Sequence, residues 1–302
     1  MRIRPTTVLG GLAVMALVVF SGMAGGQVMT APPTLDGLDR PVPPAFRTVT
    51  ADRVVSALAL DRLAGLMSEE IVASGDPLQP VEPGASDPEW AVIAGRIAAA
   101  PRIRTGLRQG IARGLSGLDP GARAAMAEAL GFLESDLGRR VVGMELAARA
   151  ALADPEIEAE ARAGFARAAG RGDPRVDQIR RLIAASDTVE PAVAASLGIT
   201  MASMMAMQET LGLAPTAEAV AEDVWLLEPE LRAEQAGWIE ALFFLSTATL
   251  TPPEMERLIA EAARPGSRRL GAMVDAAAAD VFVRVARDLG RAAALRRMGT
   301  RL

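Results

Sequence analysis

Four methionines in one short apolar stretch are the residues of this chain most able to bind a ligand. Met201, Met204 and Met205 fall on one face of a helix, and Met207 lies off that face. Thioether sulfur is a soft donor that selects Cu(I) or Ag(I), so these three side chains are a candidate Cu(I) site. Methionine also fills irregular cores and permissive grooves. Because the chain has no His and no Cys to add affinity, we favour packing and keep Cu(I) binding as the weaker alternative.

The rest of the catalytic inventory is sparse. The chain contains no His, Cys or Tyr, and all 32 of its basic residues are Arg. The commonest general base, thiolate nucleophiles and Schiff-base lysines are therefore missing. The sequence also lacks a G-x-S-x-G motif, a P-loop and a dinucleotide fingerprint. We therefore predict a protein that is not an enzyme and that needs no cofactor.

Two acidic groups are the next candidates for chemistry. Glu156, Glu158 and Glu160 alternate in sequence, so on a helix they point around the axis and not at one place. A second group surrounds an expected helix start at Pro229, where the helix dipole explains it. A glycosidase that uses two carboxylates needs a cleft lined by sugar-stacking aromatics, and none of the three tryptophans lies in an obvious acidic loop. Both groups are therefore interpreted as solvated helix faces.

The richest aromatic block runs from Trp225 to Phe244. Aromatic side chains dominate core burial, so a core role is the default for this block. The alternative is a groove or pocket between helices for a partner or an apolar ligand. For that alternative we take Trp225, Trp238 and Phe243, together with Met204, as the candidate lining.

The overall charge limits the partners. The formal net charge is −5 and the pI is about 5.1. This balance disfavours broad binding to nucleic acid or to anionic lipid. We expect an envelope protein or a peptide as the partner and no nucleic acid.

Residues 1–26 have the layout of an export signal. Arg2 and Arg4 precede an uncharged, mostly apolar run from Thr6 to Phe20, and small residues follow. We predict a cleaved signal peptide and a periplasmic protein. Alternatively, residues 6–26 are long enough to remain as an anchor in the inner membrane, which would be the only membrane contact. Residues 27–48 are rich in Pro and predict a linker.

Helix starts are marked along the chain by Asp or Thr followed by Pro. Such a residue accepts hydrogen bonds from free amides at the N-cap, and Pro at the first helical position gives up no bond. No segment alternates with period two, so we predict an all-α multi-helix bundle without a sheet. The expected starts are Asp87-Pro88, Asp119-Pro120, Asp154-Pro155, Asp173-Pro174 and Thr251-Pro252. One apolar stripe of the last helix consists of Leu270, Val274, Ala277, Val281, Val285 and Leu289.

The chain contains a weak internal sequence repeat. Residues 138–144 (GRRVVGM) match residues 267–273 (SRRLGAM) without gaps, and each follows a helix that starts at Pro. We predict a duplicated helix–kink–helix unit, with one copy in an N-terminal half (49–186) and one in a C-terminal half (187–302). In each copy, Gly or Pro is expected to interrupt one helix and let the next leave at an angle.

The same segments resemble a known family. Residues 132–140 (FLESDLGRR) resemble its F-x-x-S-P-x-G-R pattern, with Asp136 where the family favours Pro. Residues 250–254 (LTPPE) and 264–268 (RPGSR) resemble its L-T-P-x-E and T-P-x-G-Q segments. The family is the one catalogued as domain of unknown function 2059, and the similarity extends over roughly residues 51–297, with residues 57–61 in the opening helix. The resemblance implies a helical fold and a Gram-negative envelope location, and it implies no catalytic residue.

These observations together predict an exported helical protein that binds or scaffolds in the cell envelope. The leading version is binding of a peptide or another envelope protein in a groove between helices. A carrier of an apolar small molecule, held between helices near Trp225, Trp238 and the methionines, is the alternative.

Overall fold

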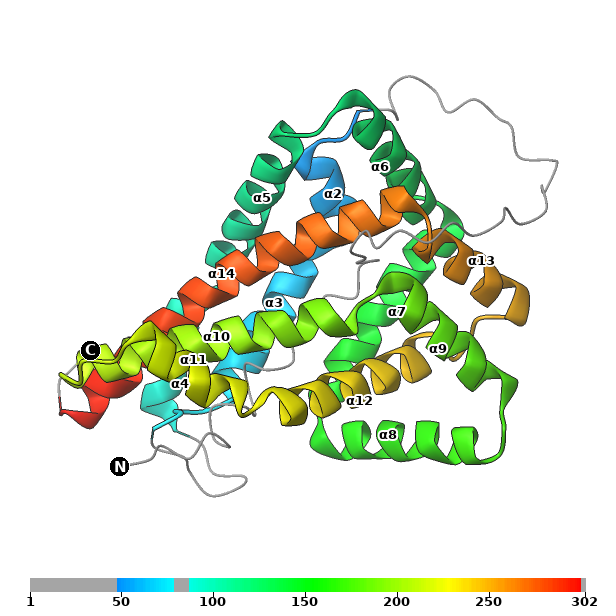
Figure 1. Cartoon of the computed structure of the whole chain (residues 1–302). Coiled ribbons are helices and arrows are strands. Elements are labelled where there is room, and N and C mark those ends of the chain that lie inside the picture. The colour runs from blue at the N-terminus through cyan, green and yellow to red at the C-terminus, as the bar shows by residue number, and fades with distance from the viewer. Residues whose placement is uncertain (1–47, 79–86, 300–302) are drawn as a thin grey trace.

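The computed structural model describes residues 48–78 and 87–299, and within these ranges every regular element is a helix. The prediction of an all-α multi-helix bundle is therefore confirmed (Figure 1). The predicted signal (1–26) and all but the last residue of the predicted linker (27–48) lie outside the described residues. The helices are α2 (Ala51–Ala57), α3 (Leu60–Ala73), α4 (Pro88–Ile97), α5 (Ala100–Ser116), α6 (Pro120–Leu133), α7 (Asp136–Leu152), α8 (Pro155–Gly170), α9 (Pro174–Ser186), α10 (Val189–Thr210), α11 (Ala217–Trp225), α12 (Glu228–Ser246), α13 (Pro252–Ala262) and α14 (Pro265–Arg297).

All five helix starts lie where the Asp-Pro and Thr-Pro pairs predict them. At each Asp-Pro pair the carboxylate accepts a hydrogen bond from a backbone amide of the first turn, as in Asp119 to the Ala122 amide at 2.8 Å. Thr251 forms a capping box, because Glu254 accepts from the Thr251 amide at 2.9 Å. That hydrogen bond, followed by one from Arg140, lowers the pKa of Glu254 to about 2. The other caps are those of α4, α8 and α9.

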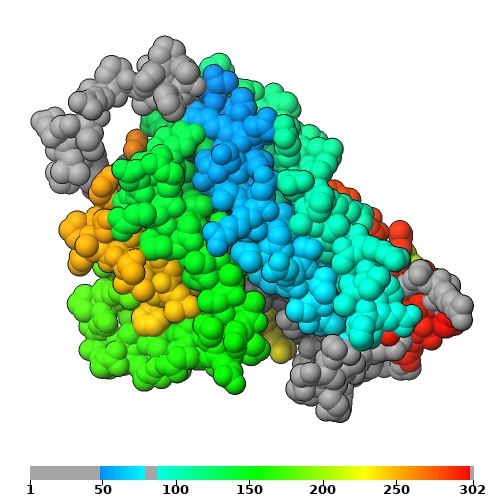
Figure 2. Space-filling view, turned by 180° about the vertical axis from the view of Figure 1, so that it is seen from behind, coloured from blue at the N-terminus to red at the C-terminus, as the bar shows by residue number. Residues whose placement is uncertain are grey.

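The long helix α14 is the central wall of the bundle. It packs against α10 on one side and against α5 and α6 on the other (Figure 1). All six residues of its predicted apolar stripe are buried. α12 in turn packs against α7, α8 and α10. One apolar core therefore draws on both the 49–186 and the 187–302 segments. Seen from behind, α2 and α3 run between α4 and α5 on one side and α6 and α7 on the other (Figure 2).

Three glycines bring α5 against α14. Gly106, Gly110 and Gly114 recur every four residues along α5. A Cβ at each would lie 2.6 Å from a side-chain carbon of Val281, Ala277 and Met273 on α14, respectively. Small residues at this spacing let two helix backbones approach closely. The buried side chains Ile103, Leu107, Ile111 and Leu115 of α5 follow the helical period. The glycines form a second stripe, which the apolar pattern does not indicate.

The far end of α14 is joined to the start of α4 by ion pairs between side chains. Arg296 lies within hydrogen-bond or ion-pair distance of Asp76, Asp87 and Glu89. The Asp76 side chain is fully buried and that of Arg296 is 16% exposed. Hydrogen bonding to Arg296 is the main cause that lowers the pKa of Asp87. The end of α14 is thus fixed to the N-terminal part of the bundle through Arg296.

Both predicted helix–kink–helix pairs are present, as α6–α7 and α13–α14, but the glycines act differently from the prediction. Ser135 breaks the first pair by capping α7, with its hydroxyl accepting from the Gly138 amide at 3.2 Å. Gly138 lies one turn later, where a Cβ would be 2.1 Å from the carbonyl oxygen of Phe132. In the second pair the glycine in close contact is Gly266, whose Cβ would be 2.1 Å from the carbonyl oxygen of Ala125. In the first pair the Ser135 cap separates the helices and Gly138 lets α7 pack onto α6. In the second pair Pro265 starts α14, and Gly266 lets α14 pack onto α6 and not onto α13.

The expectation of one continuous helix over residues 57–61 is wrong. α2 ends at Ala57, α3 begins at Leu60, and Ala59 between them is left-handed, with φ of 46°. Leu58 and Leu60 are both buried. Residues two apart on a helix point about 200° apart, so a break is what lets both leucines reach the core.

Helix α10 is long and apolar enough to cross a membrane by length and composition, with mean hydropathy 1.3. In the bundle it is a core helix, half buried by its neighbours. Gly290 of α14 approaches it so closely that a Cβ would lie 2.5 Å from the carbonyl oxygen of Ser203. Ser196, Thr200 and Ser203 are buried along α10.

Candidate functional site

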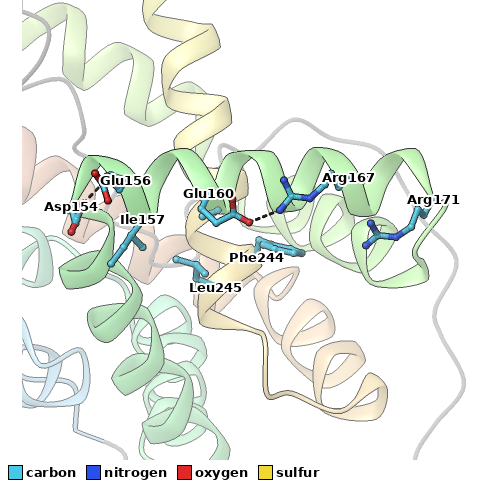
Figure 3. Close-up of a pocket in the computed structure, with 10 residues that line it drawn as sticks. Asp154, Glu156, Ile157, Glu160, Arg167, Arg171, Phe244 and Leu245 are labelled. Carbon is cyan, nitrogen blue, oxygen red and sulfur yellow. Dashed lines mark hydrogen bonds and ion pairs between the residues drawn. The ribbon is translucent and has the colours of Figure 1, made fainter.

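A surface groove between α8 and α12 has a volume of about 520 Å³. Two smaller hollows lie along the crossing of α5 and α14, with volumes of about 290 and 460 Å³, over the glycine contacts of that crossing. The α8–α12 groove differs from them in having an aromatic side chain, Phe244, in its lining. Its lining consists of Asp154, Glu156, Ile157, Glu160, Ala161, Gly164, Arg167, Arg171, Phe244 and Leu245 (Figure 3).

Phe244 is the fixed part of the floor. Its ring meets the edge of Phe165 with centroids 6.0 Å apart and planes at 79°. The Arg175 guanidinium carbon lies 5.2 Å from the Phe244 centroid, and the same side chain donates to the Phe244 carbonyl at 2.6 Å. Gly164 of α8 leaves room for the ring, since a Cβ there would be 3.0 Å from Phe244 Cε1. These contacts hold the ring in place before any ligand arrives.

The apolar floor continues along α8 towards its start. Figure 3 shows Ile157, Leu245 and Phe244 following one another beneath the helix. Ile157 is 41% exposed although it is a large aliphatic residue, and Phe244 and Leu245 are half-buried. These three side chains give the groove an apolar floor that is open to solvent.

The rim of the groove carries opposite charges at its two ends. Asp154 and Glu156 lie at the start of α8, and Arg171 follows its last residue (Figure 3). Between them Glu160 and Arg167 form an ion pair. Arg171 makes no ion pair within the described residues. This order also matches the helix dipole, so the charges suit α8 itself as well as a ligand.

Helix α8 is an outer element of the bundle. Its buried residues are Ala161, Phe165 and Ala168, and Figure 1 shows it as a layer below α12. On the side away from the groove, Arg162 pairs with Glu158 on α8 and with Glu234 on α12. Helix α8, which forms one wall of the groove, is therefore held on the bundle by three buried side chains and by the ion pairs of Arg162.

The four residues expected to line one groove are not brought together. Trp238 and Phe243 are 3% and 1% exposed and belong to the main core, where the Arg149 guanidinium carbon lies 5.0 Å from the Trp238 ring centroid. Met204 lies in a separate apolar cluster with Val220 and Val224. Trp225 is 65% exposed.

The default expectation of a core role is thus right for Trp238 and Phe243 and wrong for Trp225. Trp225 and Leu226 lie at the corner between α11 and α12, where Val224 and Leu227 take the inward positions and are buried. At such a corner the direction of the chain decides which apolar side chain faces in, and residue type alone does not.

The methionine cluster is a packing contact between α10 and α11. Met204 is buried, and Met201 and Met205 are half-buried against the same cluster as Val220 and Val224. Across residues 48–78 and 87–299 no group of three or more acidic side chains is placed to hold a metal ion.

Sequence reasoning missed Ile157, Leu245 and Arg171, and it placed Phe244 in the aromatic block without including it in the expected lining. Their signal was present in part, because Ile157 is an aliphatic residue on a helix face that also carries Glu156 and Glu160. These two glutamates are four residues apart and share the rim, whereas Glu158 points to Arg162. The pairing of α8 with the end of α12 joins residues far apart in sequence and has no local signal.

Comparison of the chain with protein-family models, with curated proteins and with solved structures gives no match. The resemblance to domain of unknown function 2059 stays an expectation from the motifs.

Proposed function

We propose that this protein is an exported binding protein of the cell envelope that holds a peptide segment of another protein in the α8–α12 groove. The observation that carries the proposal is the apolar floor of Ile157, Leu245 and Phe244 between rims of opposite charge. The export layout of residues 1–26 and the missing catalytic residue types support the compartment and the binding role. The periplasm is the proposed location, with an anchor formed by residues 6–26 as the alternative.

The charge pattern favours a peptide over an apolar small molecule. From Glu156 to Arg171 the groove extends over 15 helical residues, about 22 Å at 1.5 Å per residue. That length matches about four turns of a helical peptide or seven residues of an extended one. A matching peptide presents apolar side chains to Ile157 and Phe244, a basic residue towards Glu156 and an acidic residue towards Arg171. An apolar carrier ligand would leave both charged rims without partners.

No catalytic step is assigned to the groove. The two charged groups at its middle, Glu160 and Arg167, neutralise each other in an ion pair. Asp154 is engaged as the N-cap of α8, where it accepts from the Glu156 amide at 2.9 Å. The groove therefore supplies binding surface and fixed charges, and it presents no evident nucleophile with a base beside it.

A displayed library of random 16-residue peptides, selected on the full chain and then measured by fluorescence anisotropy, tests the proposal. We expect selected peptides to lose about tenfold or more in affinity for Ile157→Glu and for Arg171→Glu. Val92→Glu is the matched control, because Val92 is 53% exposed on α4, away from the groove, and it should bind as the native chain does.

Equal affinities of the native chain, Ile157→Glu and Val92→Glu for the selected peptides would contradict the groove. Ile157 is exposed, so its substitution should leave the fold intact, and circular dichroism checks this. A stoichiometric lipid found by native mass spectrometry, displaced by Ile157→Glu and unaffected by Arg171→Glu, would favour the apolar-carrier alternative.

A further inference from the structure

The corner between α11 and α12 exposes two large apolar side chains side by side. Trp225 is 65% exposed and Leu226 is 79% exposed, whereas the other two tryptophans, Trp90 and Trp238, are 2% and 3% exposed. A surface tryptophan carries a large, stiff contact area and is enriched among the residues that dominate binding energy at interfaces. We call Trp225 and Leu226 the corner pair.

The corner pair is held on a fixed platform. Val224 and Leu227, its chain neighbours, are buried in two apolar clusters under the corner. The backbone is closed by hydrogen bonds from the Leu227 amide to the Val224 carbonyl at 3.0 Å and from the Leu226 amide to the Glu222 carbonyl at 3.3 Å. With both inward side chains anchored, the two outward ones are presented to solvent in a defined arrangement.

The chain around the corner pair is strongly acidic. Residues 209–231, which contain α11 and the start of α12, have six Asp or Glu and no basic residue, and the next basic residue is Arg232. Arg232 is already engaged, because it pairs with both Glu190 and Glu228. Four acidic residues near the corner are exposed and make no ion pair within the part of the chain that the structure describes: Glu218, Glu222, Asp223 and Glu230. The surface therefore combines an aromatic anchor with uncompensated negative charge.

We propose that the corner pair and its acidic surround form a docking surface for a cationic amphipathic segment of a partner protein, one with Arg or Lys beside a leucine-like side chain. Charge complementarity selects this partner, because opposite potentials attract across an interface. The exposed face of an indole ring also attracts guanidinium and ammonium groups. The same charge repels nucleic acid and anionic bilayers, so a protein segment is the occupant that fits.

This surface is separate from the α8–α12 groove. The corner lies at the start of α12 and Phe244 lies near its end, about 24 Å along the helix for the 16 residues from Glu228 to Phe244. The inference therefore does not rest on the proposed function, and either surface can fail its test without the other. If both bind, α12 sets the spacing between two partners.

The test uses two synthetic 14-residue probe peptides of the same Leu pattern, one with Arg and one with Glu at every polar position. Each is titrated into the full chain and followed by anisotropy of the peptide and by quenching of tryptophan emission with acrylamide. We expect the Arg peptide to bind, to shield the exposed tryptophan from acrylamide, and to lose about tenfold in affinity between about 0.05 and 0.5 M salt. The Glu peptide should not bind.

Variants separate the corner pair from general attraction to an acidic protein. Trp225→Ala should weaken the Arg peptide about tenfold, and Glu222→Gln combined with Asp223→Asn should weaken it several-fold and flatten the salt dependence. Leu213→Ala is the matched control, since Leu213 is 54% exposed in the turn between α10 and α11, and it should bind as the native chain does.

Three results would overturn the inference. One is equal binding of the Arg and Glu peptides. Another is unchanged affinity of Trp225→Ala, which would mean attraction to charge alone. The third is protection of Trp225 from acrylamide by phosphatidylcholine vesicles without any peptide, which would assign the corner pair to a bilayer surface. Because Trp225 is exposed, its replacement should preserve the fold, and thermal unfolding of each variant verifies this.

Discussion

Replacing Gly110 by alanine tests the close contact between α5 and α14. A Cβ at this position would lie 2.6 Å from the Cβ of Ala277 and 3.0 Å from its Cα. Carbon atoms in good contact are about 3.5–4.0 Å apart, so the two helices must separate by about 1 Å. Ala277 offers backbone and a Cβ, neither of which can rotate away, so the separation must extend to the contacts at Gly106 and Gly114.

The magnitude follows from two opposing effects. Overpacking a close-packed core costs about 1–3 kcal/mol. Alanine in place of glycine within a helix returns up to about 1 kcal/mol through its better helix propensity. We expect Gly110→Ala to lower the free energy of unfolding by about 1–2 kcal/mol. For a domain of this size each kcal/mol moves Tm by about 2–4 °C.

Gly143→Ala in α7 is the matched control, because a Cβ at Gly143 meets nothing within 4 Å. The same substitution should there raise the free energy of unfolding by about 0.5–1 kcal/mol. Calorimetry and urea unfolding measure both variants, and Ala277→Gly added to Gly110→Ala should recover part of the loss. If Gly110→Ala is stabilised as much as Gly143→Ala, α5 does not pack closely on α14 at these glycines.

Three further predictions concern a buried carboxyl, a buried ion pair and the methionine cluster. Burial raises the pKa of Glu145 to about 8, so the native state binds this proton more tightly than the unfolded state and the free energy of unfolding falls as pH rises from about 4.5 to 8. Glu145→Gln should therefore be more stable than the native chain by at least about 1 kcal/mol above pH 8 and equally stable below pH 4. Equal unfolding curves at pH 9 would contradict this. Arg149→Met removes the guanidinium that donates to Glu70 at 2.7 and 2.9 Å and stacks on Trp238. Urea unfolding should show a free energy of unfolding lower by about 2–4 kcal/mol, and the near-ultraviolet circular dichroism should change. An unchanged free energy of unfolding would mean that the ion pair is dispensable. If the methionines only pack, the triple variant Met201→Leu, Met204→Leu and Met205→Leu should keep a free energy of unfolding within about 1.5 kcal/mol per site of the native value. A titration of the native chain under reducing conditions should then show no stoichiometric Cu(I) uptake.

The parts of the fold that the sequence predicts well are those set by neighbours along the chain. An Asp-Pro pair caps its own helix whatever lies across the bundle, and the stripe of α14 depends only on the helical period. The corner at Trp225 and the break at Ala59 depend instead on where the chain must turn to pack. Residue type wrongly predicts that Trp225 is buried, and the continuous helical pattern wrongly predicts an unbroken helix through Ala59.

The candidate groove was the least predictable part. Its floor joins Ile157 of α8 to Phe244 of α12, and nothing within either segment indicates that the two helices lie side by side. The aromatic block of α12 drew attention to Trp238 and Phe243, which are the inward-facing residues. Phe244, the adjacent residue in the chain, points to the other side and is available to a ligand.

The place of α14 at the end of the chain has a consequence for biosynthesis. This helix of 33 residues is the central wall of the core, and its ion pairs join residues as far apart in sequence as Asp76 and Arg296. A nascent chain that has not yet reached α14 leaves the buried faces of α5, α6 and α10 uncovered, so we expect the bundle to close only after this helix has been made. Contacts of such long range also slow folding. We therefore expect the stable fold to form late, once α14 has been synthesised, and not stepwise from the N-terminal helices.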